Sequence, residues 1–261
     1  MGIFLLRCLG IAALLLLAIT LGRHVGLRAK GRESSAEKTS LGTVVGAMLL
    51  LMSFILAITY SLTSSRFAER KQLLLDDVNA ISTLDLRGDF LSPAGRDESR
   101  SLIREYVQLR AHESVAAPEI QELQAATDRW AAIHQQLWDL ATRDQQLLSD
   151  QAGRKLYFEA LNTMFDIHTS RYNTEYILRI QKPIWFLLAI VTTLAITSLG
   201  VEIGLSGIHS RASILVVILL AITLSTLLLF LHEVDKPESD VITISQQPMI
   251  KLYKELTAGK N

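Results

Sequence analysis

Few side chains in this sequence stand at the spacings that catalysis or metal binding requires. The chain has no glycine-rich phosphate loop, no nucleophile elbow, no His-Glu-x-x-His pair and, with Cys8 as its one cysteine, no paired-cysteine zinc site. His168 follows Asp166 by two residues, so on a helix the two side chains point to different faces and a shared metal is disfavoured. The sequence therefore predicts a protein that is not an enzyme and that holds no metal and no cofactor.

Two features inside apolar runs could still serve a membrane function. Glu202 is an acid within such a run, which marks it as a functional candidate, but it lies near the end of the run, where it is expected at the membrane interface. Leu50, Phe54 and Ile58 recur at intervals of four residues. If this line faces the axis of an oligomer, rings of apolar side chains constrict a pore and gate it by dewetting. Ordinary packing or lipid contact is the alternative.

The same run carries small residues that would let another helix approach closely. Small side chains at helical spacing are typical of tight contacts between membrane helices, because they bring two backbones together. The candidates for such helix packing are Gly42, Gly46, Ser53, Ala57 and Ser61. A close neighbour for this surface predicts a homo-oligomer.

The apolar residues are gathered into runs long enough to cross a bilayer. They make up 49% of the 261 residues, and 26 Lys+Arg against 26 Asp+Glu leave no net charge, which argues against nucleic acid as a partner. A hydrocarbon core needs about 20 apolar helical residues. The lipid bilayer is therefore the expected surroundings, with transmembrane helices at 1–22, 41–62, 183–205 and 212–231, a basic link at 23–40 and a tail at 232–261.

The middle of the chain, 63–182, has the pattern of an extramembrane helical domain. Its apolar residues recur at spacings of three and four, first from Ala68 to about Phe90 in direct continuation of the second run. After Pro118 one apolar face continues to Leu147, a length of about 30 residues that is typical of a bundle helix. A last helix is expected from Arg154 to Lys182, feeding the third run, and a strand is suggested only for 241–245. The expected fold is all-α, with this domain between the second and third transmembrane helices.

The residues after the second run are similar to a known signature. Arg66, Arg70, Asp77, Asn79 and Arg87, then Arg171, and in the tail Asp235 and Pro237, resemble in order and spacing the bestrophin-like (DUF4239) family of bacterial membrane proteins. The resemblance covers nearly the whole chain from Leu41 on. The sequence departs from the family pattern at Asp77, where Glu is usual, and at Asp240, where Gly is expected.

This resemblance implies an architecture more than an activity. Bestrophins are pentameric anion channels with cytosolic helical domains and an apolar neck on the second span. The resemblance thus implies a pentamer in the bacterial inner membrane, with anions as permeant ions, Leu50, Phe54 and Ile58 at the neck and 63–182 in the cytoplasm. Basic residues are nearly balanced between the two faces and slightly favour the opposite orientation. Too few carboxylates follow the last span to predict calcium binding. A non-conducting scaffold or sensor is the alternative function, and a membrane enzyme is a third.

Overall fold

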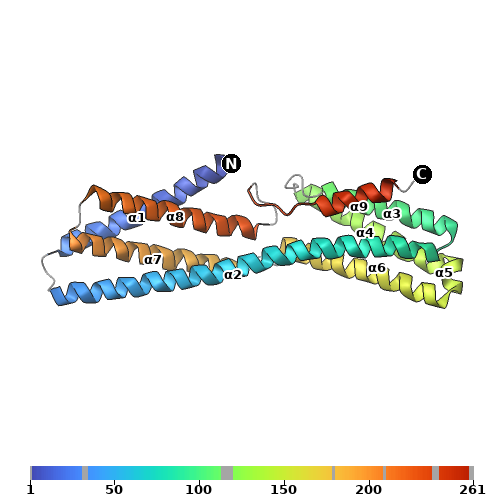
Figure 1. The fold of residues 1–261 in the computed structure, drawn as a ribbon, viewed down its shortest axis with the longest axis horizontal. Coiled ribbons are helices and arrows are strands. Elements are labelled where there is room, and N and C mark those ends of the chain that lie inside the picture. The colour runs from blue at the N-terminus through green and yellow to red at the C-terminus, as the bar shows by residue number, and fades with distance from the viewer. Residues whose placement is uncertain are drawn as a thin grey trace. The chain divides into compact units, whose positions relative to one another are not determined.

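The computed structural model describes residues 2–30, 35–112, 120–177, 180–207, 210–236 and 241–258, and all regular structure within them is helical. The expected all-α fold class is confirmed. The helices in chain order (Figure 1) are α1 Gly2–Ala29, α2 Ser35–Arg87, the short 3-10 helix Gly88–Phe90, α3 Pro93–His112, α4 Ile120–Arg143, α5 Gln145–Ser149, α6 Gln151–Tyr172, the π-helical turn Asn173–Ile177, α7 Lys182–Ser206, α8 Arg211–Asp235 and α9 Gln247–Ala258.

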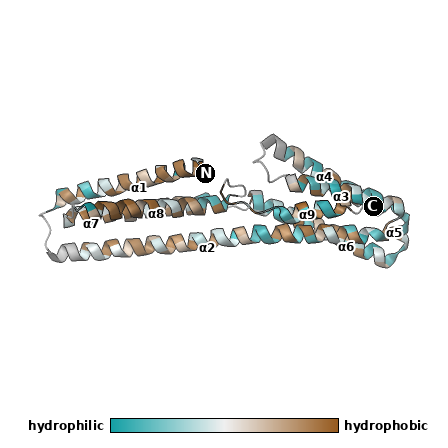
Figure 2. Cartoon of the chain, turned by 45° about the horizontal axis from the view of Figure 1, so that its top comes forward, coloured by the Kyte–Doolittle hydropathy of each residue, from teal (hydrophilic) through white to brown (hydrophobic). Residues whose placement is uncertain are grey.

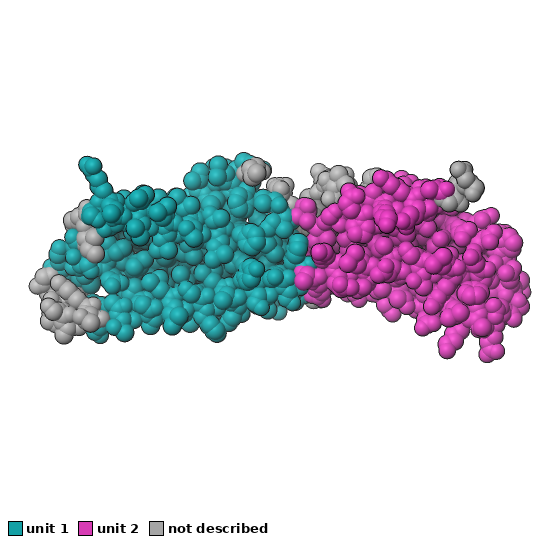
Figure 3. All heavy atoms as spheres, viewed as in Figure 1, with its two compact units in different colours: residues 1–67, 179–242 teal, residues 68–178, 243–261 magenta. Residues whose placement is uncertain are grey.

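The chain forms two compact units, each continuous in space but not in sequence (Figure 3). One consists of Met1–Phe67 with Arg179–Ile242, and the other of Ala68–Leu178 with Thr243–Asn261. Four helices are long and apolar enough to cross a membrane within the described ranges: α1, the first part of α2, α7 and α8. Figure 2 shows the contrast, with hydrophobic colour concentrated on α7 and α8 and hydrophilic colour spread over α3 and α5. We refer to the first unit as the membrane unit and to the second as the extramembrane unit.

Helices α1 and α7 of the membrane unit pack backbone against backbone. A Cβ atom added to Gly22 or Gly26 of α1 would lie 2.1 Å from the carbonyl oxygen of Thr197 or 2.2 Å from that of Val201. The reverse holds on α7, where a Cβ on Gly200 would lie 2.3 Å from the carbonyl oxygen of Ile19. Gly204 is equally enclosed, so a pair of glycines four residues apart on each helix permits the approach. The sequence predicted helix packing at Gly42 and Gly46 but not at these four glycines.

All four membrane helices contribute to one apolar core in this unit. Its buried members include Ile19 of α1, Leu56 of α2, Ile196 of α7 and Leu224 of α8. The inner face of α2 is therefore settled by packing, with Met52 and Leu56 each 7% exposed. The outer face of the same helix is left for other contacts.

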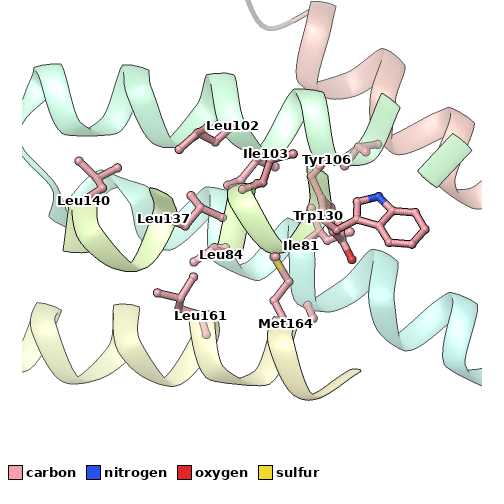
Figure 4. Packing of buried hydrophobic residues seen from close by; sticks show 14 of the residues in the cluster. Ile81, Leu84, Leu102, Ile103, Tyr106, Trp130, Leu137, Leu140, Leu161 and Met164 are labelled. Carbon is pink, nitrogen blue, oxygen red and sulfur yellow. The ribbon is translucent and has the colours of Figure 1, made fainter. Parts of the chain in front are cut away.

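The extramembrane unit has a core of large side chains contributed by α2, α3, α4 and α6 (Figure 4). Ile81 and Leu84 of α2 meet Ile103 and Tyr106 of α3 in this core, and further buried members are Trp130, Leu137, Leu161 and Met164. Helix α9 closes it with Met249 and Leu252, which are 0% and 4% exposed. The apolar spacing of three and four in the sequence thus corresponds to a bundle with one shared interior.

Three local predictions were wrong. The helix after Pro118 does not continue to Leu147, because Asp144 has extended backbone and its side chain caps α5 by accepting from the Leu147 N–H at 2.9 Å. The helix expected to reach Lys182 is interrupted, since Ile180 and Gln181 are not helical and α7 starts with proline in its first turn. The described residues of the segment 241–245 form no strand.

Candidate functional site

The apolar line on α2 lies on the outer face of the membrane unit. Leu50 is 72% exposed, Phe54 61% and Ile58 45% within the single chain. Met52 and Leu56, between them in sequence, point the other way into the core. The described residues of the chain therefore leave much of these three large apolar side chains uncovered, and a neighbouring molecule, lipid or an aqueous pathway must meet the exposed parts.

The small residues of α2 follow an adjoining part of the same outer surface. Gly46, Ser53, Ala57 and Ser61 are exposed, and a Cβ added to Gly46 would meet nothing within 4 Å. Gly42 differs, because a Cβ there would lie 3.1 Å from Oε1 of Glu202 on α7. The chain's own helices thus occupy the space beside Gly42 but leave the rest of this line uncovered.

In the extramembrane unit, the motif residue Asp77 is the centre of a buried charge cluster. Its Oδ2 accepts from Nη1 of Arg171 at 2.9 Å and from Nη2 of Arg110 at 3.4 Å. The Asp77 and Arg110 side chains are 0% exposed, and that of Arg171 is 2% exposed. One carboxylate on α2 therefore joins α6 and α3 through two guanidinium groups in a site that water does not reach.

Arg171 extends this cluster to the C-terminal segment. Its Nε donates to Glu175 Oε1 at 3.1 Å, which supplies a second negative charge, and its Nη2 donates to Gln246 Oε1 at 3.2 Å. Arg110 also stacks over Trp130, with 5.0 Å between the guanidinium carbon and the ring centroid. The cluster is thus electrically balanced, and it connects helices that are far apart in sequence.

The other motif residues lie at separate places. Arg70 is 4% exposed, whereas Arg66 is half-buried and Asn79 is exposed. Arg87 donates through Nη1 to the carbonyl oxygen of Leu156 at 2.6 Å, holding the end of α2 to α6. In the membrane unit, Asp235 is 6% exposed and accepts from the Ile180 N–H at 3.3 Å. Pro237 lies outside the described residues. Most of the motif residues with described contacts therefore join one helix to another, and they do not gather in one reactive centre.

A cluster of aromatic and imidazole rings beside Arg110 was not found from the sequence. His168 Nδ1 lies 2.9 Å from the hydroxyl of Tyr106, and the His134 ring stands edge-on to the His168 ring with 4.7 Å between centroids. Trp130 and Phe165 complete the cluster. The available signal was the spacing of Trp130 and His134, one turn apart on the apolar stripe of α4.

The surroundings keep both imidazoles neutral. Burial lowers the pKa of His134 to about 4, with the positive charge of Arg110 adding to the effect and Asp77 opposing it. Burial likewise lowers the pKa of His168 to about 3, assisted by Arg110, His134 and Arg171. Across the part of the chain that the structure describes, no three His, Cys, Asp or Glu side chains gather to hold a metal ion. The arrangement suits helix packing and hydrogen bonding rather than acid–base chemistry at neutral pH.

Comparison with known proteins agrees with this architecture. The family model for the Bestrophin-like domain matches residues 9–249. Two mutant crystal structures of a bacterial bestrophin homologue from Klebsiella pneumoniae superpose with TM-scores of 0.70 and 0.68 at 14% and 15% identity, each comparison covering 95% of this chain and 99% of the other. A crystal structure of a mutant membrane protein gives a TM-score of 0.67 at 13% identity over 99% of this chain and 98% of the other. No curated protein matches.

The fold is that of a four-span membrane protein with a helical extramembrane unit inserted between the second and third spans. The chain belongs to the Bestrophin-like family. The family predicted from Arg66, Asp77, Arg171 and their neighbours is thereby confirmed, and the structural likeness supports the same fold.

Proposed function

We propose that this protein is an oligomeric ion channel in which the outer face of α2 lines the pathway. The observation that carries the proposal is the exposure of Leu50, Phe54 and Ile58 in three successive turns of a membrane helix whose opposite face is packed. Four spans of one chain cannot enclose a conduction path, so several copies must supply it. Rings of these three side chains would form an apolar neck that gates by dewetting.

The small residues of α2 support the oligomer. Because Gly46, Ser53, Ala57 and Ser61 are uncovered in the single chain, a helix from a second copy can approach there at short distance. The family resemblance implies five copies, and it implies anions as the permeant ions. The mass of the purified protein in detergent, measured by light scattering, tests this assembly, and a mass equal to one chain would exclude it.

Phe54→Ala tests the neck directly. If the three side chains ring a pore, loss of the middle ring widens and wets the constriction. Anion flux into liposomes should rise by about tenfold, which corresponds to a barrier lower by about 1.4 kcal/mol. The matched control is Phe186→Ala on α7, because Phe186 is also strongly exposed, at 69%, but stands on another membrane helix. Flux through that variant should stay at the level of the natural protein.

The same preparations separate the channel from the alternative function, a scaffold or sensor. If Phe54 is instead packed against protein with no pore beside it, its truncation leaves a cavity that costs about 3–5 kcal/mol on the scale of soluble cores. The melting temperature would then fall without any gain in flux. That pair of results would contradict the neck and favour the non-conducting function.

We place the protein in the bacterial inner membrane with the extramembrane unit in the cytoplasm, on the strength of the family resemblance. A cysteine introduced after Ser149, the last residue of α5, gives a position to label. A membrane-impermeant maleimide should react with it only after the cells are opened. Labelling of intact cells would reverse the assignment.

A further inference from the structure

The membrane unit contains an apolar groove between α2 and α8 that the channel proposal does not use. Its volume is about 310 Å³, within the range of about 300–1,000 Å³ that is usual for small-molecule sites. Tyr60, Ser64 and Phe67 line it from α2, and Phe230, Leu231 and Val234 line it from α8. Leu231 and Val234 are 0% and 8% exposed, so the inner part of the groove is a fixed apolar surface.

The polar groups of the groove are few and are placed along the α2 wall. The hydroxyl of Thr63 is occupied, because it donates to the carbonyl oxygen of Thr59 at 2.6 Å. Tyr60 and Ser64 lie one helical turn apart and are exposed, and among the described residues their hydroxyl groups make no hydrogen bond. An occupant would therefore be mainly apolar, with an oxygen-rich part able to accept from these hydroxyls.

The position of the groove along its helices indicates which molecule reaches it. On α8, the apolar run ends at Leu231 and gives way to His232 and Glu233, one residue before Val234. On α2, the first charged residue after the apolar run is Arg66, beside Phe67. Tyr60 and Phe230 remain 52% and 40% exposed at this depth, as aromatic residues do where a membrane protein meets lipid headgroups.

We propose that this groove binds one acyl chain of a phospholipid, with the ester region of that lipid beside Ser64. The groove is continuous with the exposed apolar surface formed by Leu227 and Phe230 of α8, and in a membrane protein that surface contacts the bilayer. The acyl chain covers the apolar wall, and the serine hydroxyl donates to an ester carbonyl. The site does not depend on whether the protein conducts ions.

Filling the groove tests the site. Val234→Trp places an indole against Leu231, whereas Val216→Trp makes the same change on α8 at a position that is 63% exposed and outside the groove. Both proteins are purified in dodecyl maltoside, and co-purifying phospholipid is counted by native mass spectrometry. We expect about one lipid per chain fewer in Val234→Trp and no loss in Val216→Trp. Equal lipid content in the two variants would overturn the proposal.

A reporter variant keeps the test decisive if Val234→Trp does not fold. Phe230→Trp preserves an aromatic ring on the groove, and the fluorescence that it adds to that of Trp130, Trp138 and Trp185 in the natural chain is quenched by dibrominated phosphatidylcholine added to dodecyl maltoside micelles. Relative to Val216→Trp, we expect half-maximal quenching at a lipid mole fraction about fivefold lower, the ratio given by a difference of about 1 kcal/mol in affinity. Equal mole fractions would mean only bulk lipid contact. Quenching that is lost when the oligomer forms would assign the groove to a second copy instead; either result refutes the lipid site.

Discussion

The two units of this protein pack their helices by opposite means. In the membrane unit, α1 and α7 approach through Gly22, Gly26, Gly200 and Gly204, with carbonyl oxygens close to the space that a Cβ would fill. In the extramembrane unit, α2, α3, α4 and α6 are kept apart by large side chains such as Trp130 and Tyr106, and a buried charge cluster joins them. Glycines permit close backbone contact in the membrane unit, whereas large apolar side chains and paired charges fill the interior of the extramembrane unit.

The surrounding solvent accounts for the difference. Lipid is as apolar as a leucine side chain, so burying leucines between membrane helices gains little, and close backbone packing has to supply the attraction. In water, the burial of apolar surface stabilises the folded state by about 25 cal/mol per Å². Once such a core exists, a charge inside it must be paired, since an uncompensated buried charge is strongly destabilising.

The largest effect is expected at Asp77. Asp77→Asn leaves the buried guanidinium of Arg110 and that of Arg171 without the carboxylate that both donate to. Breaking a buried ion pair in this way costs about 3–5 kcal/mol. Denaturant unfolding of the full chain in detergent, followed by the fluorescence of Trp130 and Trp138, measures the loss. The control is the neighbouring Asp76→Asn, which alters a hydrogen bond donated by Gln72 and should cost less than about 1 kcal/mol. Equal losses in the two variants would show that the buried ion pairs of Asp77 contribute no more stability than this exposed hydrogen bond.

A smaller effect is expected from glycine in the membrane unit. Gly200→Ala places a methyl group 2.3 Å from the carbonyl oxygen of Ile19, so α1 and α7 must separate. Overpacking of this kind costs about 1–3 kcal/mol. The melting temperature in detergent should fall for this variant. Gly10→Ala in α1 is the control, because a Cβ there meets nothing within 4 Å. An unchanged melting temperature for Gly200→Ala would mean that the close contact contributes nothing.

Much of this fold was predictable because it depends on local pattern. Runs of about 20 apolar residues predict spans, and spacings of three and four predict the helices that cover Ile81, Leu84 and Ile103. The break at Asp144 was not predictable in the same way. Its carboxylate caps α5 and also accepts from the Ser92 N–H at 3.1 Å, a contact across 52 residues that no local pattern contains.

In the candidate site as well, features that depend on local spacing were predictable, and features that depend on contacts between distant segments were not. The period of Leu50, Phe54 and Ile58 was visible, but only the structure shows which face of α2 the chain itself covers. Gly22 and Gly200 were present as plainly as Gly42 and Gly46, yet spacing alone does not say which pair of helices meets. The Asp77 cluster joins α2, α3, α6 and the C-terminal segment, so its members could be noticed singly but not assembled.

The smallest effect concerns the ring cluster and appears only on acidification. His134 and His168 have folded-state pKa values of about 4 and about 3, below the unfolded value of about 6.5. The folded state therefore favours the neutral rings, while the unfolded chain takes up protons as soon as the pH falls toward about 6.5. The stability that the neutral rings contribute is fully present above that pH, and it is lost as the pH falls from about 6.5 toward about 4 for His134 and toward about 3 for His168.

The slope of this loss distinguishes the ring cluster from the rest of the protein. Each histidine can contribute at most about 1.4 kcal/mol per pH unit, and less here because both rings are only partly buried. The measurement is the free energy of unfolding of the extramembrane unit at intervals between pH 7.5 and about 5. This free energy should decline more steeply in the natural chain than in His168→Asn, because that variant lacks one titrating ring. The control is His232→Asn in the membrane unit, where the ring stands edge-on to Trp185, and the slope measured for the extramembrane unit of that variant should match the slope in the natural chain. Because Arg110 and Arg171 repel the protonated His168 ring, the difference between the two slopes should have this sign and not the reverse. A parallel decline in the natural chain and in His168→Asn would show that the folded protein hydrates the imidazolium of His168 as well as the unfolded chain does, which would contradict the lowering of its pKa by burial.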